Sequence, residues 1–189
     1  FVDGKELSSN RLEIKKKIGY VADSPDLFLR LTANEFWELV ATSYDMTTAE
    51  VEARLDELLS IFDFASHRYE VIESFSHGMR QKVFVIGALL SDPDIWVLDE
   101  PLTGLDPQAA FDLKQMMREH ADKGNTVLFS THVLEVAEQL CDKIAILKKG
   151  ELIFYGTIED LKGQHPEQSL EAIYLGLAGR REEVSPDAP

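Results

Sequence analysis

Two adjacent carboxylates, Asp99 and Glu100, follow the apolar run Ile95–Leu98 and precede Pro101. The run predicts a buried strand that Pro101 ends, so both carboxylates should lie at the sheet edge where ligands bind in α/β folds. One carboxylate can hold Mg²⁺, directly or through water, and the other can orient a water molecule that attacks phosphorus. We therefore interpret the pair as the centre of a phosphate-handling site. The alternative is an ordinary strand end with two solvated acids.

Other residues suited to phosphate chemistry stand on either side of this pair. Ser76 and Gly78 open an expected helix, whose first N–H groups and Ser hydroxyl could bind an anion. Asp106 precedes Pro107 and is a good helix cap. His132 follows an expected strand, and its imidazole could donate to a phosphate oxygen. The alternatives are a plain Ser-capped helix, a purely structural Asp cap and a solvated histidine.

In this order the motifs resemble those of the second half of an ATP-binding-cassette (ABC) ATPase, the motor domain of ABC transporters. The resemblance runs from Phe1 to about Leu177. Residues 75–79 read Phe-Ser-His-Gly-Met where the family signature reads Leu-Ser-Gly-Gly-Gln, and this variant looks like that of exporter-type members. The resemblance implies a P-loop NTPase-type α/β fold, with ATP and Mg²⁺ as cofactors.

The resemblance also implies roles for single residues. Asp99, in the Walker B motif, would serve Mg²⁺, and Glu100 would be the catalytic base or water-orienting group. His132 would sense the γ-phosphate. Ser76 and Gly78 would contact a nucleotide bound to the opposite subunit of a dimer, and Asp106, in the segment called the D-loop, would communicate across that dimer.

Asp23 departs from the family pattern. It stands after the expected strand Ile18–Val21, where the family has a Gln that contacts Mg²⁺ and the attacking water. An Asp could still bind Mg²⁺ through water, or it could weaken catalysis. Its alternative role is that of a turn-forming residue before Ser24 and Pro25.

The sequence contains no G-x-x-x-x-G-K-[ST] phosphate loop (Walker A). Residues 1–4 look like the strand and turn that follow this loop in the family. We read the chain as a fragment, or a processed product, that lacks the first strands and the loop. We therefore expect this chain to bind MgATP weakly, or not at all, on its own.

Composition narrows the class of protein. The chain has 189 residues, of which 44% are hydrophobic and 28% charged, as in an ordinary soluble domain with a sizeable core. The formal net charge of −15 argues against a nucleic-acid partner, since such binding needs a basic face. Cys141 is the single cysteine, so no internal disulfide can form, as is typical of a reducing cytoplasm. The longest apolar run, Val83 to Leu90, is far short of the ~18 residues that suggest a membrane span.

Alternating strand and helix patterns predict an α/β fold with a mostly parallel sheet and an inserted helical subdomain. Thr32 and Thr47, each followed by Glu three residues later, predict capping boxes at the starts of two helices. Strands are expected at 18–21, 95–98, 126–130, 144–147 and 152–155, the last two joined by a turn at Lys149 and Gly150. Further helices are expected from 77, from 107, at 133–140 and, weakly amphipathic, at 169–177.

The expected domain organisation has three parts. Residues 1–24 and 91–163 form a partial P-loop NTPase-type core, and residues 25–90 form the helical subdomain with the signature segment. Residues 164–189 form a C-terminal helix and a disordered tail.

The leading hypothesis is the ATPase subunit of an ABC transporter, working as a homo- or heterodimer at the cytoplasmic face of a membrane with a separate permease subunit. A soluble ABC ATPase that works on DNA or ribosomes is the second reading, which the acidic charge and the lack of long heptads disfavour. A non-catalytic dimerising or regulatory remnant is the third. The transported substrate, the direction of transport and the membrane partner cannot be read from the sequence.

Overall fold

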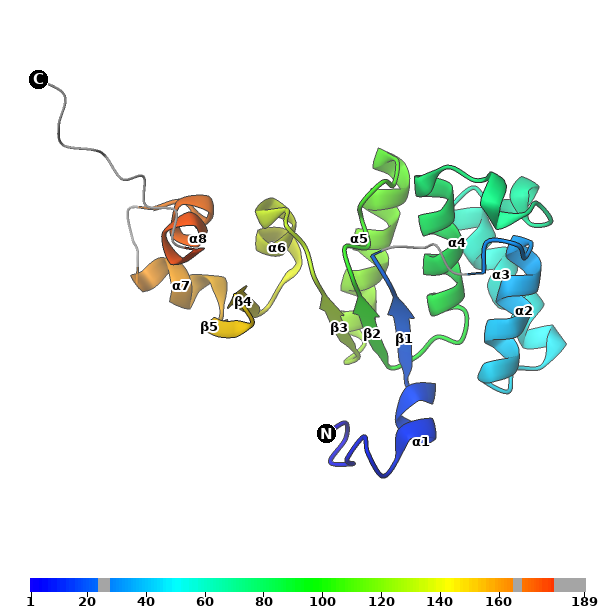
Figure 1. The fold of residues 1–189 in the computed structure, drawn as a ribbon, viewed down its shortest axis with the longest axis horizontal. Coiled ribbons are helices and arrows are strands. Elements are labelled where there is room, and N and C mark those ends of the chain that lie inside the picture. The colour runs from blue at the N-terminus through cyan, green and yellow to red at the C-terminus, as the bar shows by residue number, and fades with distance from the viewer. Residues whose placement is uncertain (24–27, 165–167, 179–189) are drawn as a thin grey trace, which may run out of the picture. The chain divides into compact units, whose positions relative to one another are not determined.

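The computed structural model describes residues 1–23, 28–164 and 168–178 of the chain. These residues fall into two compact units, with the boundary between Ser130 and Thr131. Figure 1 gives the order of their helices and strands. Within the described ranges, no helix is both long and apolar enough to cross a bilayer.

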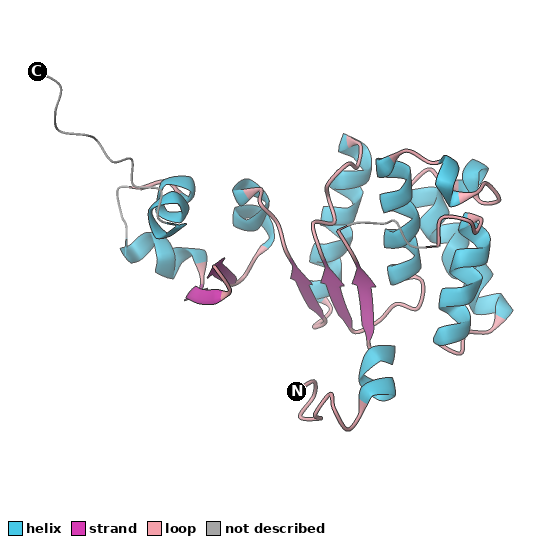
Figure 2. Cartoon of the chain, in the orientation of Figure 1, coloured by secondary structure: helices cyan, strands magenta, loops and turns pink. Residues whose placement is uncertain are grey.

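The first unit is built on a parallel sheet of three strands in the order β1-β2-β3, comprising β1 (Ile18–Val21), β2 (Ile95–Leu98) and β3 (Thr126–Phe129). Val21 pairs with Leu98, which in turn pairs with Phe129, so the strands end level with one another. The three arrowheads point to the same edge in Figure 2. The predicted strands and their parallel arrangement are confirmed, and the residues after each strand share one edge.

Helices fill the connections of this unit. The segment between β1 and β2 contains α2 (Ala33–Ser43), α3 (Thr48–Ile61), the short 3₁₀ turns η1 (Ala65–His67) and η2 (Ile72–Ser74), and α4 (His77–Leu89). Both predicted capping boxes are present, at Thr32 and Thr47. Helix α5 (Pro107–Asp122) connects β2 to β3. The run of helices after residue 25 is therefore confirmed, while their standing as a separate domain stays a prediction.

A helix that the sequence did not predict, α1 (Arg11–Lys16), precedes β1. It buries Ile14 and leaves Leu12 80% exposed. The sequence of α1 therefore lacks the periodic apolar pattern from which a helix is predicted. The expected strand at residues 1–4 is reduced to a bridge between Val2 and Lys5.

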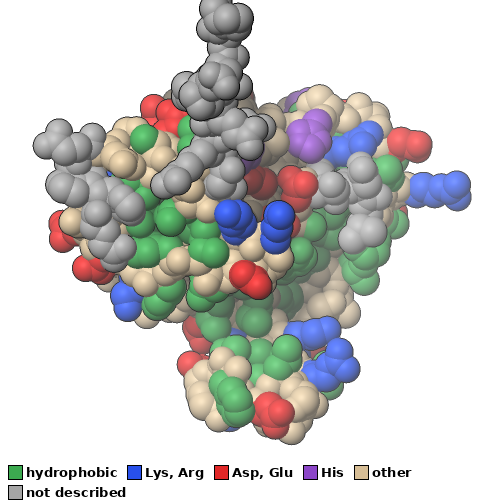
Figure 3. Space-filling view, turned by 60° about the vertical axis from the view of Figure 1, so that its left-hand side comes forward, with side chains coloured by type: hydrophobic (Ala, Val, Ile, Leu, Met, Phe, Trp, Pro, Cys, Tyr) green, Lys and Arg blue, Asp and Glu red, His purple; other side chains and the backbone are tan. Residues whose placement is uncertain are grey.

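One face of the sheet is covered by α4 and α5. A β-carbon on Gly19 would stand 2.3 Å from the Ala88 carbonyl oxygen of α4, so only glycine allows this approach. Trp96 stacks on His120 of α5, with ring centroids 4.1 Å apart. On the opposite face Tyr20 and Leu128 are 60% and 62% exposed. Exposed hydrophobic side chains also show among the charged ones in the space-filling view (Figure 3).

Three aromatic residues that follow β1, Phe28, Phe36 and Trp37, divide between core and surface. Phe36 and Trp37 are buried, and Trp37 donates its indole N–H to the Val83 carbonyl of α4 at 2.9 Å. Phe28 stays 47% exposed and packs on Phe36.

The second unit contains α6 (Leu134–Leu140), the antiparallel strands β4 (Ile144–Lys148) and β5 (Glu151–Gly156), α7 (Ile158–Gln164) and α8 (Leu170–Ala178). The predicted hairpin is confirmed, with Lys149 and Gly150 both at positive φ in its turn. The core of the second unit includes Ile146, Leu161, Leu170 and Ile173. Helix α7 was not predicted, and the tail from residue 179, expected to be disordered, lies outside the described residues.

Candidate functional site

The carboxylate pair lies directly after β2, at the edge where all three strands of the first unit end. Asp99 continues the ladder with β1, because its N–H donates to the Val21 carbonyl at 2.9 Å. Ser130 continues the ladder on the other side, because its N–H donates to the Leu98 carbonyl at 2.9 Å. Both side chains of the pair are half-buried. The two acids therefore follow a strand that is paired on both sides, and they lie at the sheet edge as predicted.

The Ser130 hydroxyl joins the two acidic residues. It donates to Asp99 Oδ1 at 2.5 Å and accepts the Glu100 N–H at 3.0 Å. Glu100 has a φ of 45°, in the left-handed region that a residue other than glycine seldom occupies. A turn follows at once, since the Thr103 N–H donates to the Glu100 carbonyl at 3.1 Å. The backbone thus leaves the strand conformation at Glu100, directly after Asp99.

The start of α4 has the cap that the sequence predicted. The Ser76 hydroxyl accepts the Met79 N–H at 3.3 Å. Gly78, in the first turn, lies against the loop after β2, where a β-carbon would come within 2.1 Å of the Gly104 carbonyl oxygen. Gly104 itself has a φ of 78°, and a β-carbon there would come within 2.5 Å of His77 Cδ2. Gly78 therefore has a packing role inside this chain that the sequence did not indicate.

Asp106 is tied to two neighbours. Its Oδ1 accepts the Ala109 N–H at 2.9 Å, which confirms the predicted cap of α5. Its Oδ2 forms an ion pair with Lys82 Nζ of α4 at 2.7 Å. Lys82, and after it the Ala109 N–H, lower the pKa of the Asp106 carboxyl. Lys82 Nζ also donates to the Phe62 carbonyl at 3.1 Å, so this ammonium links the ends of α3 and α5 to α4.

Two further predicted site residues, Asp23 and His132, are exposed. Asp23 is exposed and follows β1 at the same edge as Asp99. His132 is exposed and belongs to the second unit, two residues beyond Ser130. Their roles toward Mg²⁺ and phosphate stay predictions.

The donor set suits one kind of metal site. Among residues 1–23, 28–164 and 168–178, no group of three or more His, Cys, Asp or Glu side chains is placed to hold a metal ion. Mg²⁺ that accompanies a nucleotide takes one or two protein carboxylates and completes its shell with phosphate oxygens and water. One half-buried carboxylate at a sheet edge, Asp99, fits that requirement.

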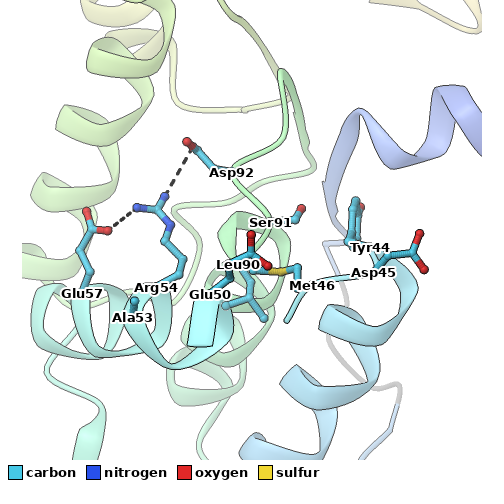
Figure 4. A pocket seen from close by; sticks show the side chains of 10 residues that line it. All are labelled: Tyr44, Asp45, Met46, Glu50, Ala53, Arg54, Glu57, Leu90, Ser91 and Asp92. Carbon is cyan, nitrogen blue, oxygen red and sulfur yellow. Dashed lines mark hydrogen bonds and ion pairs between the residues drawn. The ribbon is translucent and has the colours of Figure 1, made fainter. Parts of the chain in front are cut away.

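A hollow of about 460 Å³ elsewhere in the first unit includes none of these residues. Figure 4 shows the Arg54 guanidinium there between the carboxylates of Glu57 and Asp92, at 2.5 and 3.6 Å. The Arg54 charge is already paired by two acids, so this hollow offers no free cation to an anionic ligand. Its walls are Tyr44, Asp45, Met46, Glu50, Ala53, Arg54, Glu57, Leu90, Ser91 and Asp92.

The sequence did not indicate the contacts of three residues that contribute to the site: Ser130, Lys82 and Gly104. The serine could have been suspected, because it follows the strand next to Asp99 in a parallel sheet. The other two act through contacts between α4 and the loop after β2, which no local pattern reports.

Comparison with known proteins agrees with this geometry. A family model described as "ABC transporter" matches residues 1–103. EcsA, an ABC-type transporter ATP-binding protein of Bacillus subtilis (strain 168), is 35% identical over 178 residues, which cover 93% of this chain and 72% of EcsA. NatA, an ABC transporter ATP-binding protein of the same organism, is 32% identical over 175 residues, covering 92% of this chain and 71% of NatA.

Solved structures give the same result. The ATP-binding subunit of an ABC transporter superimposes with a TM-score of 0.86 at 35% identity, covering 93% of this chain and 74% of that one. The dimeric ATP-binding cassette MJ0796, in a post-hydrolysis state with ADP and Pi, superimposes with a TM-score of 0.69 at 25% identity, covering 82% and 69%. The P-loop NTPase fold class is thus confirmed, and the chain belongs to the family of ABC transporter ATP-binding proteins.

Proposed function

We propose that this protein is the ATP-binding and ATP-hydrolysing subunit of an exporter-type ABC transporter, which powers transport through a separate membrane subunit. The observation that supports the proposal most directly is the pair Asp99 and Glu100 at the carboxyl edge of a parallel sheet, fixed by Ser130. Phosphoryl transfer to water needs positioning and electrostatic stabilisation, and two adjacent acids can divide that work.

Within this proposal each acid has its own task. Asp99 holds Mg²⁺, which when bound neutralises charge on the phosphate oxygens, and Asp23 assists it through water. Glu100 orients the attacking water and accepts its proton. His132 donates to the γ-phosphate. None of these side chains needs to become a nucleophile.

The remaining residues act across a dimer. Ser76 and Gly78, in the first turn of α4, contact the nucleotide of the opposite subunit. Asp106 communicates with that subunit across the dimer interface. The solved MJ0796 cassette is a dimer with ADP and Pi bound, which supports this arrangement. We place the dimer at the cytoplasmic face of the membrane, on a permease subunit, with no nucleic acid involved.

The proposal also concerns the affinity of this chain for MgATP. Its sequence has no G-x-x-x-x-G-K-[ST] loop, the element whose N–H groups and Lys cradle the phosphates. We therefore propose that the chain by itself binds MgATP weakly. Equilibrium dialysis with labelled ATP measures this directly, and a submicromolar Kd would contradict it.

Dimer formation tests the function itself. Glu100→Gln keeps the size of the side chain but removes the base. When the variant is made in the protein as its source cell produces it (the native protein), it should accumulate as an ATP-bound dimer at millimolar MgATP. Light scattering after gel filtration measures the mass, with exposed Glu6→Gln as the matched control. A Glu100→Gln protein that stays monomeric while binding MgATP would support the non-catalytic regulatory alternative instead.

A further inference from the structure

Ser130 contacts both residues of the acidic pair. Its backbone is fixed to β2 through the Leu98 carbonyl at 2.9 Å. Its side chain contacts two different parts of the acidic pair, the carboxylate of Asp99 and the backbone N–H of Glu100. The residue itself is exposed, so these polar contacts, rather than core packing, account for its side chain.

The chemistry of a hydroxyl matches this double contact. A serine has one O–H donor and two acceptor lone pairs, so it can donate to Asp99 and accept from Glu100 at the same time. The bond to Asp99 fixes the rotation of that carboxylate. The bond to Glu100 secures an N–H in a residue at φ 45°, a conformation that needs support from its surroundings.

We propose that Ser130 is a positioning residue for ATP hydrolysis, which sets the direction of the Asp99 carboxylate and holds Glu100 in its left-handed conformation. The inference rests on the proposed function for the reaction that the two acids serve. Ser130 acts through its contacts with these two residues. Loss of its hydroxyl lowers the rate of the chemical step more than it weakens the binding of ATP.

Backbone amide exchange of Glu100, followed by NMR, tests the geometric part without any nucleotide. Ser130→Val and Ser130→Thr form a matched pair, since their shapes agree and the second retains the hydroxyl. We expect Glu100 to exchange about tenfold faster in Ser130→Val, as for loss of one hydrogen bond, and at close to the wild-type rate in Ser130→Thr. Ser60→Ala, at an exposed position on α3, is the control. Equal exchange in the Val and Thr variants would overturn the proposal.

Steady-state ATP hydrolysis by the native protein tests the catalytic part with the same variants. We expect kcat to fall in Ser130→Val with little change in the KM for ATP, and Ser130→Thr to restore most of it. A change in KM alone would overturn the positioning role. If the wild-type protein hydrolyses no ATP, the proposed function fails, whereas the exchange of Glu100 still decides whether Ser130 holds the pair.

Discussion

A β-carbon on Gly78 would stand 2.1 Å from the carbonyl oxygen of Gly104, well inside the closest approach that real side chains show. This relationship brings the first turn of α4 against the loop that follows the carboxylate pair. Two segments that bear site residues therefore depend on each other's backbone. Movement of one segment has to be accommodated by the other.

Gly78→Ala should destabilise the protein, although Gly→Ala in a helix normally stabilises it by about 0.5–1 kcal/mol. The added methyl group meets a backbone carbonyl that cannot simply rotate away, so we expect a loss of about 1–3 kcal/mol in the free energy of unfolding. Urea denaturation followed by circular dichroism measures it. Gly163→Ala, in α7 with open space around the new methyl, is the control and should not destabilise. Equal stability of the two variants would refute the packing role.

The two roles of Asp106 can be separated by substitution. Asp106→Asn keeps a capping oxygen for Ala109 but removes the charge that pairs with Lys82, so it should cost less than about 1 kcal/mol. Asp106→Ala removes both contacts and should cost about 1–2 kcal/mol. Thermal unfolding of both variants checks the order. Equal losses in the two variants would mean that the cap contributes nothing.

The Lys82 ion pair also predicts a pH dependence. Because the pKa of Asp106 is lowered in the folded protein, its stabilising effect is complete above the ordinary Asp range near 4 and is lost as the pH falls below it. The difference in stability between wild type and Asp106→Asn should therefore shrink below about pH 4. Denaturation at a series of pH values between neutral and acidic tests this, and a difference that grows in acid would contradict it.

His120 should make the first unit sensitive to milder acid. It is 3% exposed and stacked on Trp96, and burial lowers its pKa. The folded state therefore favours the neutral ring, so stability should fall as the pH drops through the ordinary His value near 6.5. His120→Phe keeps an aromatic ring against Trp96 and should remove this part of the pH dependence. Unchanged pH dependence in the variant would show that other groups cause it.

Replacing Arg68 by lysine should lower the stability of the protein. Its guanidinium donates two bonds to the Glu52 carboxylate, at 2.6 and 2.9 Å, and a third to Asn34 Oδ1 at 2.7 Å. A lysine cannot reproduce this fork, so Arg68→Lys should cost about 1–2 kcal/mol. Arg11→Lys, at an exposed position in α1, is the control in the same denaturation experiment. Equal stability of the two would show that the fork adds nothing.

Local patterns predicted most of the elements of the first unit. Thr32 and Thr47 open their helices with the capping boxes expected from the sequence, and the apolar run after Asp94 forms β2. These features depend on neighbours within a few residues, which is why a single sequence suffices. Helix α1 was not predicted, because a single buried residue, Ile14, gives no periodic pattern.

The site was predictable only in part, for the same reason. Asp99 and Glu100 follow from a strand end, and Asp106 from a cap before Pro107. The contacts of Asp106 with Lys82, and of Gly78 with Gly104, join segments far apart in the chain. Their geometry depends on how α4 packs against the loop after β2, and no spacing rule contains that information.

ATP hydrolysis by the native protein, compared between wild type and Glu100→Gln, tests the central claim most directly. The claim is that Glu100 orients and deprotonates the attacking water beside Asp99. We predict that the rate at saturating MgATP falls by about a hundredfold or more, the usual loss for a general base, while ATP binding is retained. Glu6→Gln should keep the wild-type rate. A Glu100→Gln protein that hydrolyses ATP as fast as the wild type would contradict the account.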